Sequence, residues 1–277
     1  MSSFVDTHAH FCDSQFDADR EEALKRAKNA GVQTIVEIAE APEGWEKAKT
    51  LSEFSFSGHG GLFPLIYWTC GFHPHYAEAL EETKFDTMKE AVSSPHCVAV
   101  GEIGLDYVKS AAPREKQISL FKKSLEVAAE FSKPVVIHCR EAQPDVLRIL
   151  KSFFGGSARQ DVCIGVIHCF SGDIHFAQMC MELGFYLGVD GPLTYPSAKN
   201  LRDVISQTPL NRIVIETDSP YLPPQGYRGK RNESSYLPLI ALKLSEIFQK
   251  NLEEVSKVTT ENAARLFRTG TPHGKSS

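Results

Sequence analysis

The chain has 277 residues, and this length suits a single α/β barrel, which takes roughly 250 residues. Hydrophobic residues make up 42% and charged residues 23% of the sequence, which excludes a largely disordered chain and allows a sizeable buried core. The net charge of −5 excludes a broadly basic protein that coats nucleic acid without specificity, so any polyanion must be captured locally by metal ions and a few arginines.

Eight short apolar runs alternate with longer amphipathic stretches, which is typical of repeated strand and helix units around a parallel sheet. The expected strands are residues 4–10, 34–40, 67–73, 97–104, 134–139, 163–170, 185–191 and 212–218. The expected helices include residues 18–31, 114–131, 144–154, 174–184, 198–207, 236–250 and 252–267. Gly31 is expected to end the first helix.

Eight strands are the number that closes an α/β barrel. We therefore predict one (β/α)₈ TIM barrel over residues 1–268, followed by a short polar tail at residues 269–277. The alternative is an open doubly wound sheet, which a glycine-rich nucleotide-binding turn after the first strand would favour. The sequence has no such turn at that place.

Ionisable residues gather at the C-terminal ends of the expected strands. The first strand ends in His8 and His10, whose side chains share one face because strand side chains alternate. The other residues placed in this way are Glu102, His138, His168 and Asp218. In a parallel barrel these ends meet at one mouth, so the six residues form one cluster of four histidines and two carboxylates. Such a cluster predicts a site for divalent cations.

Seven motifs spread from residue 5 to residue 233 carry a resemblance to a known family: VDTHAH, GFHP, GEIGLDY, VVIHCR, HCFSG, ETDSPYL and RGKRNE. They resemble the motif series of the TatD family of metal-dependent deoxyribonucleases, which have amidohydrolase-like barrels. The resemblance implies two bound divalent cations and hydrolysis of DNA phosphodiester bonds. The implied ligands form three sets: His8, His10 and Asp218 on one ion, His138 and His168 on the other, and Glu102 bridging the two.

Two places depart from the family pattern. Ser234 stands where the stretch RGKRNE usually continues with proline, and residues 108–110 lack an aromatic residue that commonly follows GEIGLDY. We expect these departures to affect loop shape and substrate choice, not metal binding.

The charges of the predicted ligands favour an anionic substrate. Two divalent cations bring four positive charges and Glu102 and Asp218 return two, which leaves a positive excess for a hydroxide and a phosphodiester to neutralise. Asp218 and Glu102 are the expected catalytic residues: a metal-activated water attacks phosphorus, and Asp218 accepts its proton. Imidazole ligands favour Zn²⁺, whereas carboxylates and water are compatible with Mn²⁺ or Mg²⁺.

Four residues are candidates for substrate binding. Arg140 has the same strand parity as His138, and Arg228 and Arg231 lie in a basic loop just after the last strand. Arginine side chains match the geometry of phosphate groups. His73, at the end of the third expected strand, is expected to contact the substrate or the leaving group.

Several other residues receive supporting roles. Glu216 should lie beneath Asp218 and hydrogen-bond a ligand, and Asp6 should be structural or play a similar supporting part. Strand alternation turns Cys139 and Cys169 away from the metal ligands, so we interpret both as packing residues. The seven cysteines are odd in number and form no CxxC pair, which predicts reduced thiols.

The predicted function is that of a divalent-metal-dependent deoxyribonuclease, acting as a 3′-exonuclease and with abasic-site endonuclease activity left open. One alternative is an amidohydrolase-type enzyme for amide, lactone or cyclic-imide bonds, which often has a carboxylated lysine where this chain has Glu102. Another is a non-catalytic metal-binding scaffold, which would leave the six ligands and the basic loop without a chemical reason.

The expected location and partners follow from missing signals. No apolar run approaches the ~18 residues of a membrane helix, and the N-terminal residues lack the pattern of a secretory signal. We therefore expect a cytoplasmic protein with no membrane contact and no obligate protein partner.

Overall fold

The computed structural model describes residues 2–58, 61–78, 84–155 and 164–270. Eight strands form one sheet in chain order, and each pairs with the next in parallel. They are β1 (Phe4–Ala9), β2 (Val32–Ala39), β3 (Leu65–Cys70), β4 (Cys97–Asp106), β5 (Val135–Arg140), β6 (Gly165–Ile167), β7 (Phe185–Val189) and β8 (Ile213–Ile215). A parallel bridge between Ala9 and Ser219 joins the last strand segment to the first. The predicted TIM barrel is confirmed.

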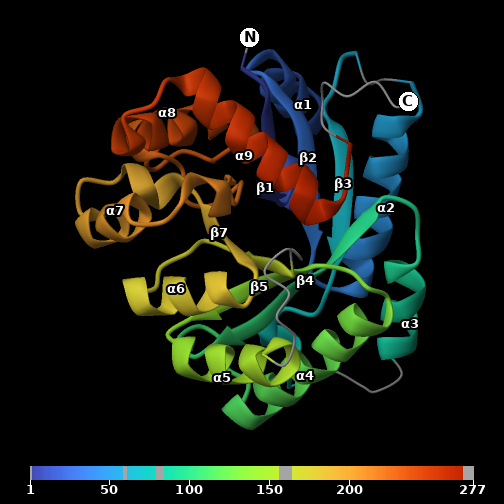
Figure 1. The fold of residues 1–277 in the computed structure, drawn as a ribbon. Coiled ribbons are helices and arrows are strands. Elements are labelled where there is room, and N and C mark those ends of the chain that lie inside the picture. Colours follow the sequence, from blue (N-terminus) through green and yellow to red (C-terminus); the bar gives the residue numbers. More distant parts are fainter. Residues whose placement is uncertain (1, 59–60, 79–83, 156–163, 271–277) are drawn as a thin grey trace.

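Helices connect the strands and surround them (Figure 1). They are α1 (Arg20–Asn29), α2 (Pro42–Phe56), α3 (Lys84–Val92), α4 (Arg114–Glu130), α5 (Gln143–Phe154), α6 (Ile174–Glu182), α7 (Lys199–Ser206), α8 (Leu237–Phe248) and α9 (Leu252–Phe267). The sequence analysis did not single out α2 and α3. Gly31 follows α1 with a φ of 92°, a conformation that glycine adopts without strain, so the predicted end of this helix is confirmed.

Three strands, β3, β6 and β8, each end three residues earlier than the sequence predicts. The expected runs reached residues 73, 170 and 218, but the strands end at Cys70, Ile167 and Ile215. Cys169 and Asp218 have φ values of 43° and 56°, which lie in the left-handed region and cannot continue an extended strand. His168 and Asp218 therefore lie on the turns after their strands.

The barrel interior contains a layer of valines that α9 covers at one end. Six strands each contribute one valine: Val5, Val36, Val98, Val136, Val166 and Val214. Residues from so many strands of a parallel barrel meet only inside it. Ala263, Leu266 and Phe267 of α9 join this cluster, and Figure 1 shows α9 lying across the strands. This packing closes the end of the barrel opposite the C-terminal ends of the strands.

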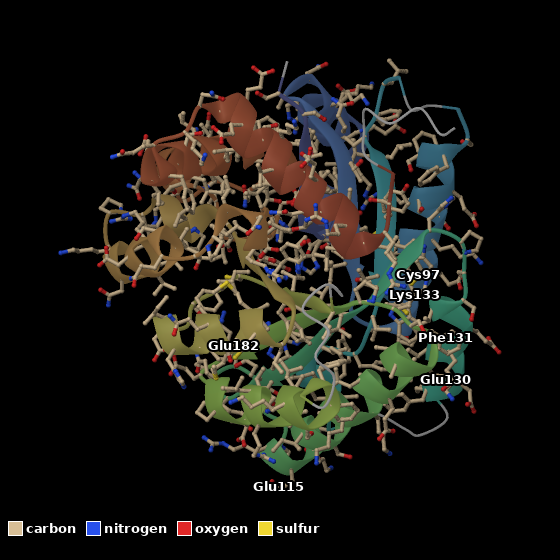
Figure 2. All side chains as sticks on the ribbon, viewed as in Figure 1. Cys97, Glu115, Glu130, Phe131, Lys133 and Glu182 are labelled. Atoms are coloured by element: carbon tan, nitrogen blue, oxygen red, sulfur yellow. The ribbon has the colours of Figure 1, made fainter. Side chains whose placement is uncertain are left out.

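Polar contacts also fix the chain where β4 begins. Lys133, in the link between α4 and β5, donates a hydrogen bond of 2.6 Å to the carbonyl oxygen of Cys97 (Figure 2). Glu130 at the end of α4 forms an ion pair of 2.7 Å with Lys89 of α3. These contacts join α3 to α4 and the link before β5 to the start of β4, at the end that carries no predicted site residue.

Two further findings concern the sequence predictions. The six cysteines that the structure describes are unpaired thiols, as predicted, while Cys163, the start of the sixth expected strand and residues 271–277 of the tail lie outside the described residues. None of the described helices is both long and apolar enough to cross a membrane.

Replacing Leu266 with alanine tests the role of α9 in closing the barrel. Leu266 is fully buried, so the cavity left by its side chain should lower the free energy of unfolding by about 2–5 kcal/mol. Lys257→Ala, at an exposed position of the same helix, should change it by less than about 0.5 kcal/mol. Urea unfolding followed by circular dichroism measures both, and equal values for the two variants would contradict the proposed packing.

Candidate metal centre

Three of the predicted ligands meet where β8 approaches β1. The backbone N–H of Asp218 donates to the carbonyl oxygen of His8 at 2.9 Å, and the N–H of His10 donates to that of Ser219 at 2.7 Å. Buried side chains support this seam, because Thr217 and Ser234 both donate hydroxyl hydrogen bonds to Asp6, at 2.6 and 2.5 Å. Asp6 therefore has the structural role predicted for it, and Ser234 has a hydroxyl where the family pattern has proline.

The spacing of these side chains fits a bound metal ion. The Nε2 atom of His8 lies 3.2 Å from His10 Nε2, 3.5 Å from Glu102 Oε2 and 3.7 Å from Asp218 Oδ1. His10 Nε2 lies 3.3 Å from the same Asp218 oxygen. Ligand bonds of about 2.0–2.1 Å in tetrahedral geometry place neighbouring ligand atoms about 3.3 Å apart. The donor atoms of His8, His10 and Asp218 therefore already stand close to the separations that a cation such as Zn²⁺ requires, and Glu102 Oε2 lies similarly close to His8 Nε2.

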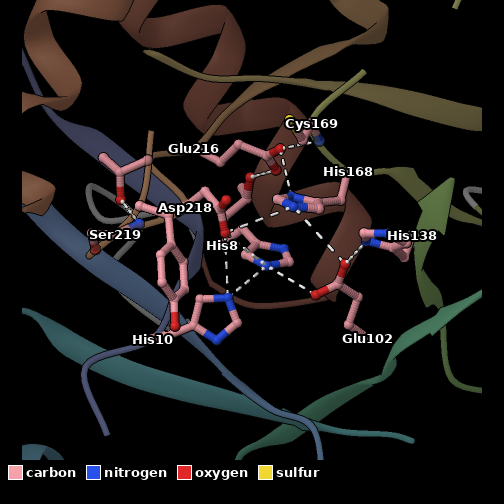
Figure 3. Close-up of polar contacts among 12 residues, drawn as sticks. His8, His10, Glu102, His138, His168, Cys169, Glu216, Asp218 and Ser219 are labelled. Carbon is pink, nitrogen blue, oxygen red and sulfur yellow. Dashed lines mark hydrogen bonds and ion pairs between the residues drawn. The ribbon is translucent and has the colours of Figure 1, made fainter. Parts of the chain in front are cut away.

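Glu102 lies between the two halves of the cluster (Figure 3). Its Oε2 atom faces His8, whereas its Oε1 atom lies 2.6 Å from His138 Nδ1 and 4.0 Å from His168 Nε2. Three groups of donor atoms meet the spacing of a metal site within the described chain: His8, His10 and Glu102; His8, His168 and Asp218; His73, Glu102 and His138. The structure thus brings all six predicted ligands together, and it adds His73 to the group around His138.

Carboxylates also hold the outer nitrogen of two ligand histidines. Glu216 Oε1 lies 2.8 Å from His168 Nδ1 and accepts a hydrogen bond of 2.6 Å from the N–H of Cys169. Asp106 Oδ2 lies 3.2 Å from His138 Nε2, while its Oδ1 accepts hydrogen bonds from the N–H groups of Val108 and Lys109. Such contacts fix the orientation and the tautomer of a histidine that binds metal.

Glu216 was expected in this supporting role, but the sequence analysis missed Asp106 and Glu37. Asp106 lies within the motif GEIGLDY, and its place at the end of β4 was the signal available. Glu37 interrupts the apolar run of β2, and its carboxylate accepts hydrogen bonds from the N–H groups of Phe11 and Cys12 at 2.7 and 2.8 Å. This contact fixes the turn that follows His10.

The histidines differ in how their surroundings shift their pKa values. Burial and the charge of His168 lower the pKa of His8. Burial would also lower the pKa of His10 and of His138, but neighbouring carboxylates outweigh it and raise both to about 9. The pKa of His168 is likewise raised despite its burial, chiefly by Glu216 and Glu102. In the metal-free protein, the positive charges of protonated His10, His138 and His168 therefore offset the negative charges of the neighbouring carboxylates.

The candidate substrate residues lie in different surroundings. His73 is buried, its ring lies 4.5 Å from the ring of His138, and burial lowers its pKa to about 3. Arg140 is exposed at the end of β5. Arg228 is exposed, and its guanidinium lies 4.8 Å from the centre of the Tyr195 ring.

Arg231 differs from the other two arginines because its guanidinium already has partners. It donates two hydrogen bonds to the carboxylate of Asp19, at 2.6 and 2.9 Å, and lies over the ring of Phe16 at 4.3 Å. These contacts tie the basic loop to the start of α1. A phosphate would have to compete with Asp19 for this arginine, so Arg140 and Arg228 are the better placed of the predicted arginines.

The site contains more negative charge than the sum over two cations, Glu102 and Asp218 includes. Glu40 and Asp106 also interact electrostatically with His138, and Glu216 contacts His168. These carboxylates offset the positive excess that the sequence analysis assigned to two cations. The charge argument for an anionic substrate was therefore incomplete, because it counted ligands and not their neighbours.

Cys139 and Cys169 have different surroundings. Cys139 packs against the hydrophobic core, as predicted. Cys169 lies beyond the end of β6, so strand alternation no longer sets its direction, and its thiol interacts with the buried carboxylate of Asp190 beside the site. Burial raises the pKa of this thiol well above its ordinary value, which keeps it protonated in the metal-free protein.

Comparisons with known proteins agree with this geometry. The model of a family described as TatD related DNase matches residues 5–268. The chain is 37% identical over 264 residues to the uncharacterized metal-dependent hydrolase YabD of Bacillus subtilis (strain 168), covering 95% of this chain and 98% of that protein. It is 32% identical over 269 residues to the 3'-5' ssDNA/RNA exonuclease TatD of Pectobacterium parmentieri (strain WPP163), covering 95% and 98%. The crystal structure of YjjV, a TatD homolog from Escherichia coli K12, superimposes with a TM-score of 0.86 at 30% identity and covers 96% of this chain and 98% of its own.

Asp106→Asn tests the role of this carboxylate in orienting His138. An amide can present its N–H₂ group to Nε2, which moves the imidazole proton to Nδ1, the nitrogen that faces Glu102. Affinity for Mn²⁺ should therefore fall by about 10- to 100-fold. Competition with a fluorescent chelator measures it, and Asp145→Asn, at a carboxylate paired with Arg148 on the surface, is the matched control. Equal affinity in the two variants would contradict the proposed role.

Metal affinity should depend on pH over an unusually high range. A cation must displace the protons of His10 and His138, whose pKa values are raised to about 9. Affinity for Mn²⁺ should therefore continue to rise between pH 7.5 and pH 9, whereas histidines with an ordinary pKa of about 6.5 would give a plateau there. Titration calorimetry in two buffers of different ionisation enthalpy measures both the affinity and the protons released. A plateau above pH 7.5 without proton release would show that these histidines are neutral.

Proposed function

Because the chain belongs to the TatD-related DNase family, we propose that this metal-dependent hydrolase of ester bonds is a deoxyribonuclease that removes nucleotides from the 3′ end of DNA. The observation that carries the proposal is the cluster of His8, His10, Glu102, His138, His168 and Asp218, which stands at metal-ligand spacing in a chain of this family. The relative named as a 3'-5' ssDNA/RNA exonuclease supports the direction of cleavage.

We assign two divalent cations to the cluster. One observation supports this number: the two oxygens of Glu102 face different histidines, Oε2 towards His8 and Oε1 towards His138. His8, His10 and Asp218 would hold one ion, and His138 and His168 the other. Zn²⁺, Mn²⁺ and Mg²⁺ all suit imidazole and carboxylate donors to different degrees. When bound, the cations would activate a water molecule and stabilise charge on the phosphoryl oxygens.

The residues of the chain have separate roles in this reaction. Asp218 accepts the proton of the attacking water, because its Oδ1 atom lies within 3.3–3.8 Å of three ligand histidines and so faces the centre of the cluster. His73 is buried beside His138 and contacts the scissile phosphate or the leaving group as a neutral imidazole. Arg140 and Arg228 attract the flanking phosphates from the rim.

A labelled-oligonucleotide digestion tests the proposed function. The Mn²⁺-loaded protein should shorten a 5′-labelled single-stranded DNA stepwise from its 3′ end. Double-stranded DNA, RNA and DNA with one abasic site, run in parallel, decide strand preference, sugar preference and internal cleavage at abasic sites. Intact substrates in all four reactions, with metal binding verified, would overturn the proposal.

Asp218→Asn should reduce turnover in this assay by about 10²- to 10⁴-fold, because the amide keeps the shape of the side chain but cannot accept a proton. Metal content and melting temperature are measured in parallel, so that loss of a cation is separated from loss of the base. Asp203→Asn, at an exposed position of α7, should behave as the unmodified protein does. Near-normal turnover of Asp218→Asn with both cations bound would show that another group accepts the proton.

A further inference from the structure

Exposed aromatic side chains are a feature of the mouth that the proposed chemistry does not use. Within the described chain, six large hydrophobic side chains are exposed, and three of them lie in segments that follow strands at the mouth: Tyr76, Val108 and Tyr221. Tyr221 is 46% exposed and follows the ligand Asp218 by three residues. Its ring lies 5.8 Å from the ring of the ligand His10, in an edge-to-face arrangement.

The polar groups of Tyr221 are all held by neighbours. Its hydroxyl donates to the carboxylate of Asp13 at 2.8 Å, and its backbone N–H donates to the carbonyl oxygen of Asp218 at 2.8 Å. Its own carbonyl oxygen accepts a hydrogen bond of 2.6 Å from the side chain of Asn232. The ring is therefore fixed in direction while nearly half of its residue surface remains open to solvent. A side chain fixed before binding loses little conformational entropy when a ligand stacks on it.

The chemistry of this ring selects the kind of group that it can bind. The ring is neutral near pH 7, because the ordinary pKa of a tyrosine hydroxyl is about 10. A neutral aromatic face attracts another flat π-system more than it attracts a phosphate. In a nucleic acid, the flat group attached to a phosphate through a single sugar is the base.

We propose that the exposed face of Tyr221 is a stacking platform for the base of the nucleotide adjoining the scissile phosphate. The proposal rests on the proposed function, because it needs a phosphodiester at the metal ligands. Stacking tolerates any base, since every base has a π-face, and it requires a base that is not paired within a duplex. Tyr221 thus gives the mouth a preference for single strands without a preference for sequence.

The proposal is tested by removing the tyrosine ring from the protein and, separately, the base from the substrate. Tyr221→Leu removes the aromatic face, and an oligonucleotide with a tetrahydrofuran abasic residue at the first or second 3′ position removes the base. Tyr221→Leu should lower kcat/KM on normal single-stranded DNA by about 5- to 100-fold. One of the two abasic substrates lacks the base that stacks on Tyr221. On that substrate, kcat/KM of Tyr221→Leu should equal kcat/KM of the unmodified protein. Tyr221→Phe keeps the ring and should retain most of the activity.

Two controls separate stacking from damage to the metal centre. Mn²⁺ affinity should be unchanged in Tyr221→Leu, and Leu242→Ala, at an exposed position on α8, should leave every rate unchanged. A loss that is equal on normal and abasic substrates would overturn the proposal, because it would assign Tyr221 to the support of His10. No loss on any substrate would overturn it as well. If the unmodified protein cleaves no oligonucleotide at all, the proposed function itself fails, and the stacking proposal fails with it.

Discussion

The seam between β8 and β1 determines where the metal ligands lie. Across it, the backbone N–H of Asp218 donates to the carbonyl oxygen of His8, and the N–H of His10 donates to that of Ser219. The ligand residues themselves form these hydrogen bonds, so their backbones cannot move apart unless the barrel opens. Unpaired backbone groups at a buried seam would be costly, which makes such an opening unfavourable. Closure of the barrel and assembly of the site therefore depend on the same backbone contacts.

Around this seam, buried carboxylates position the groups that do the chemistry. Glu216 and Asp106 each contact the outer nitrogen of a ligand histidine, and Glu37 fixes the turn after His10. Burying a carboxylate is costly unless hydrogen bonds or opposite charges compensate for the lost water. Backbone N–H groups and histidines supply that compensation here. The protein thus holds its donor set in place before any cation binds, and we propose that the rim, with Tyr221 and the exposed arginines, recognises the substrate.

The sequence was sufficient for the fold and for the members of the metal cluster. Alternating apolar runs and amphipathic stretches are local patterns, and eight of them predict a closed barrel. The positions of His8, Glu102 and the other four ligands near the ends of these runs are also local, and parallel strands carry such ends to one mouth. The family motifs added a division of the ligands between two ions, which stays a prediction; the structure places Glu102 between His8 and His138.

The tertiary structure decided the contacts between residues far apart in the chain. The sequence placed Arg231 on the substrate side, but only the fold shows that Asp19, 212 residues earlier, already binds its guanidinium. The expectation that strand alternation sets the direction of Cys169 was wrong for a local reason: β6 ends before it, and a left-handed backbone conformation replaces the extended one. The spacing of apolar residues indicates which face of a helix or strand is buried. It does not indicate which residue of another segment lies opposite that face. The sequence by itself therefore determined the barrel and the candidate ligands, whereas the pairing of charges around them was decided by how the closed barrel aligns its strands.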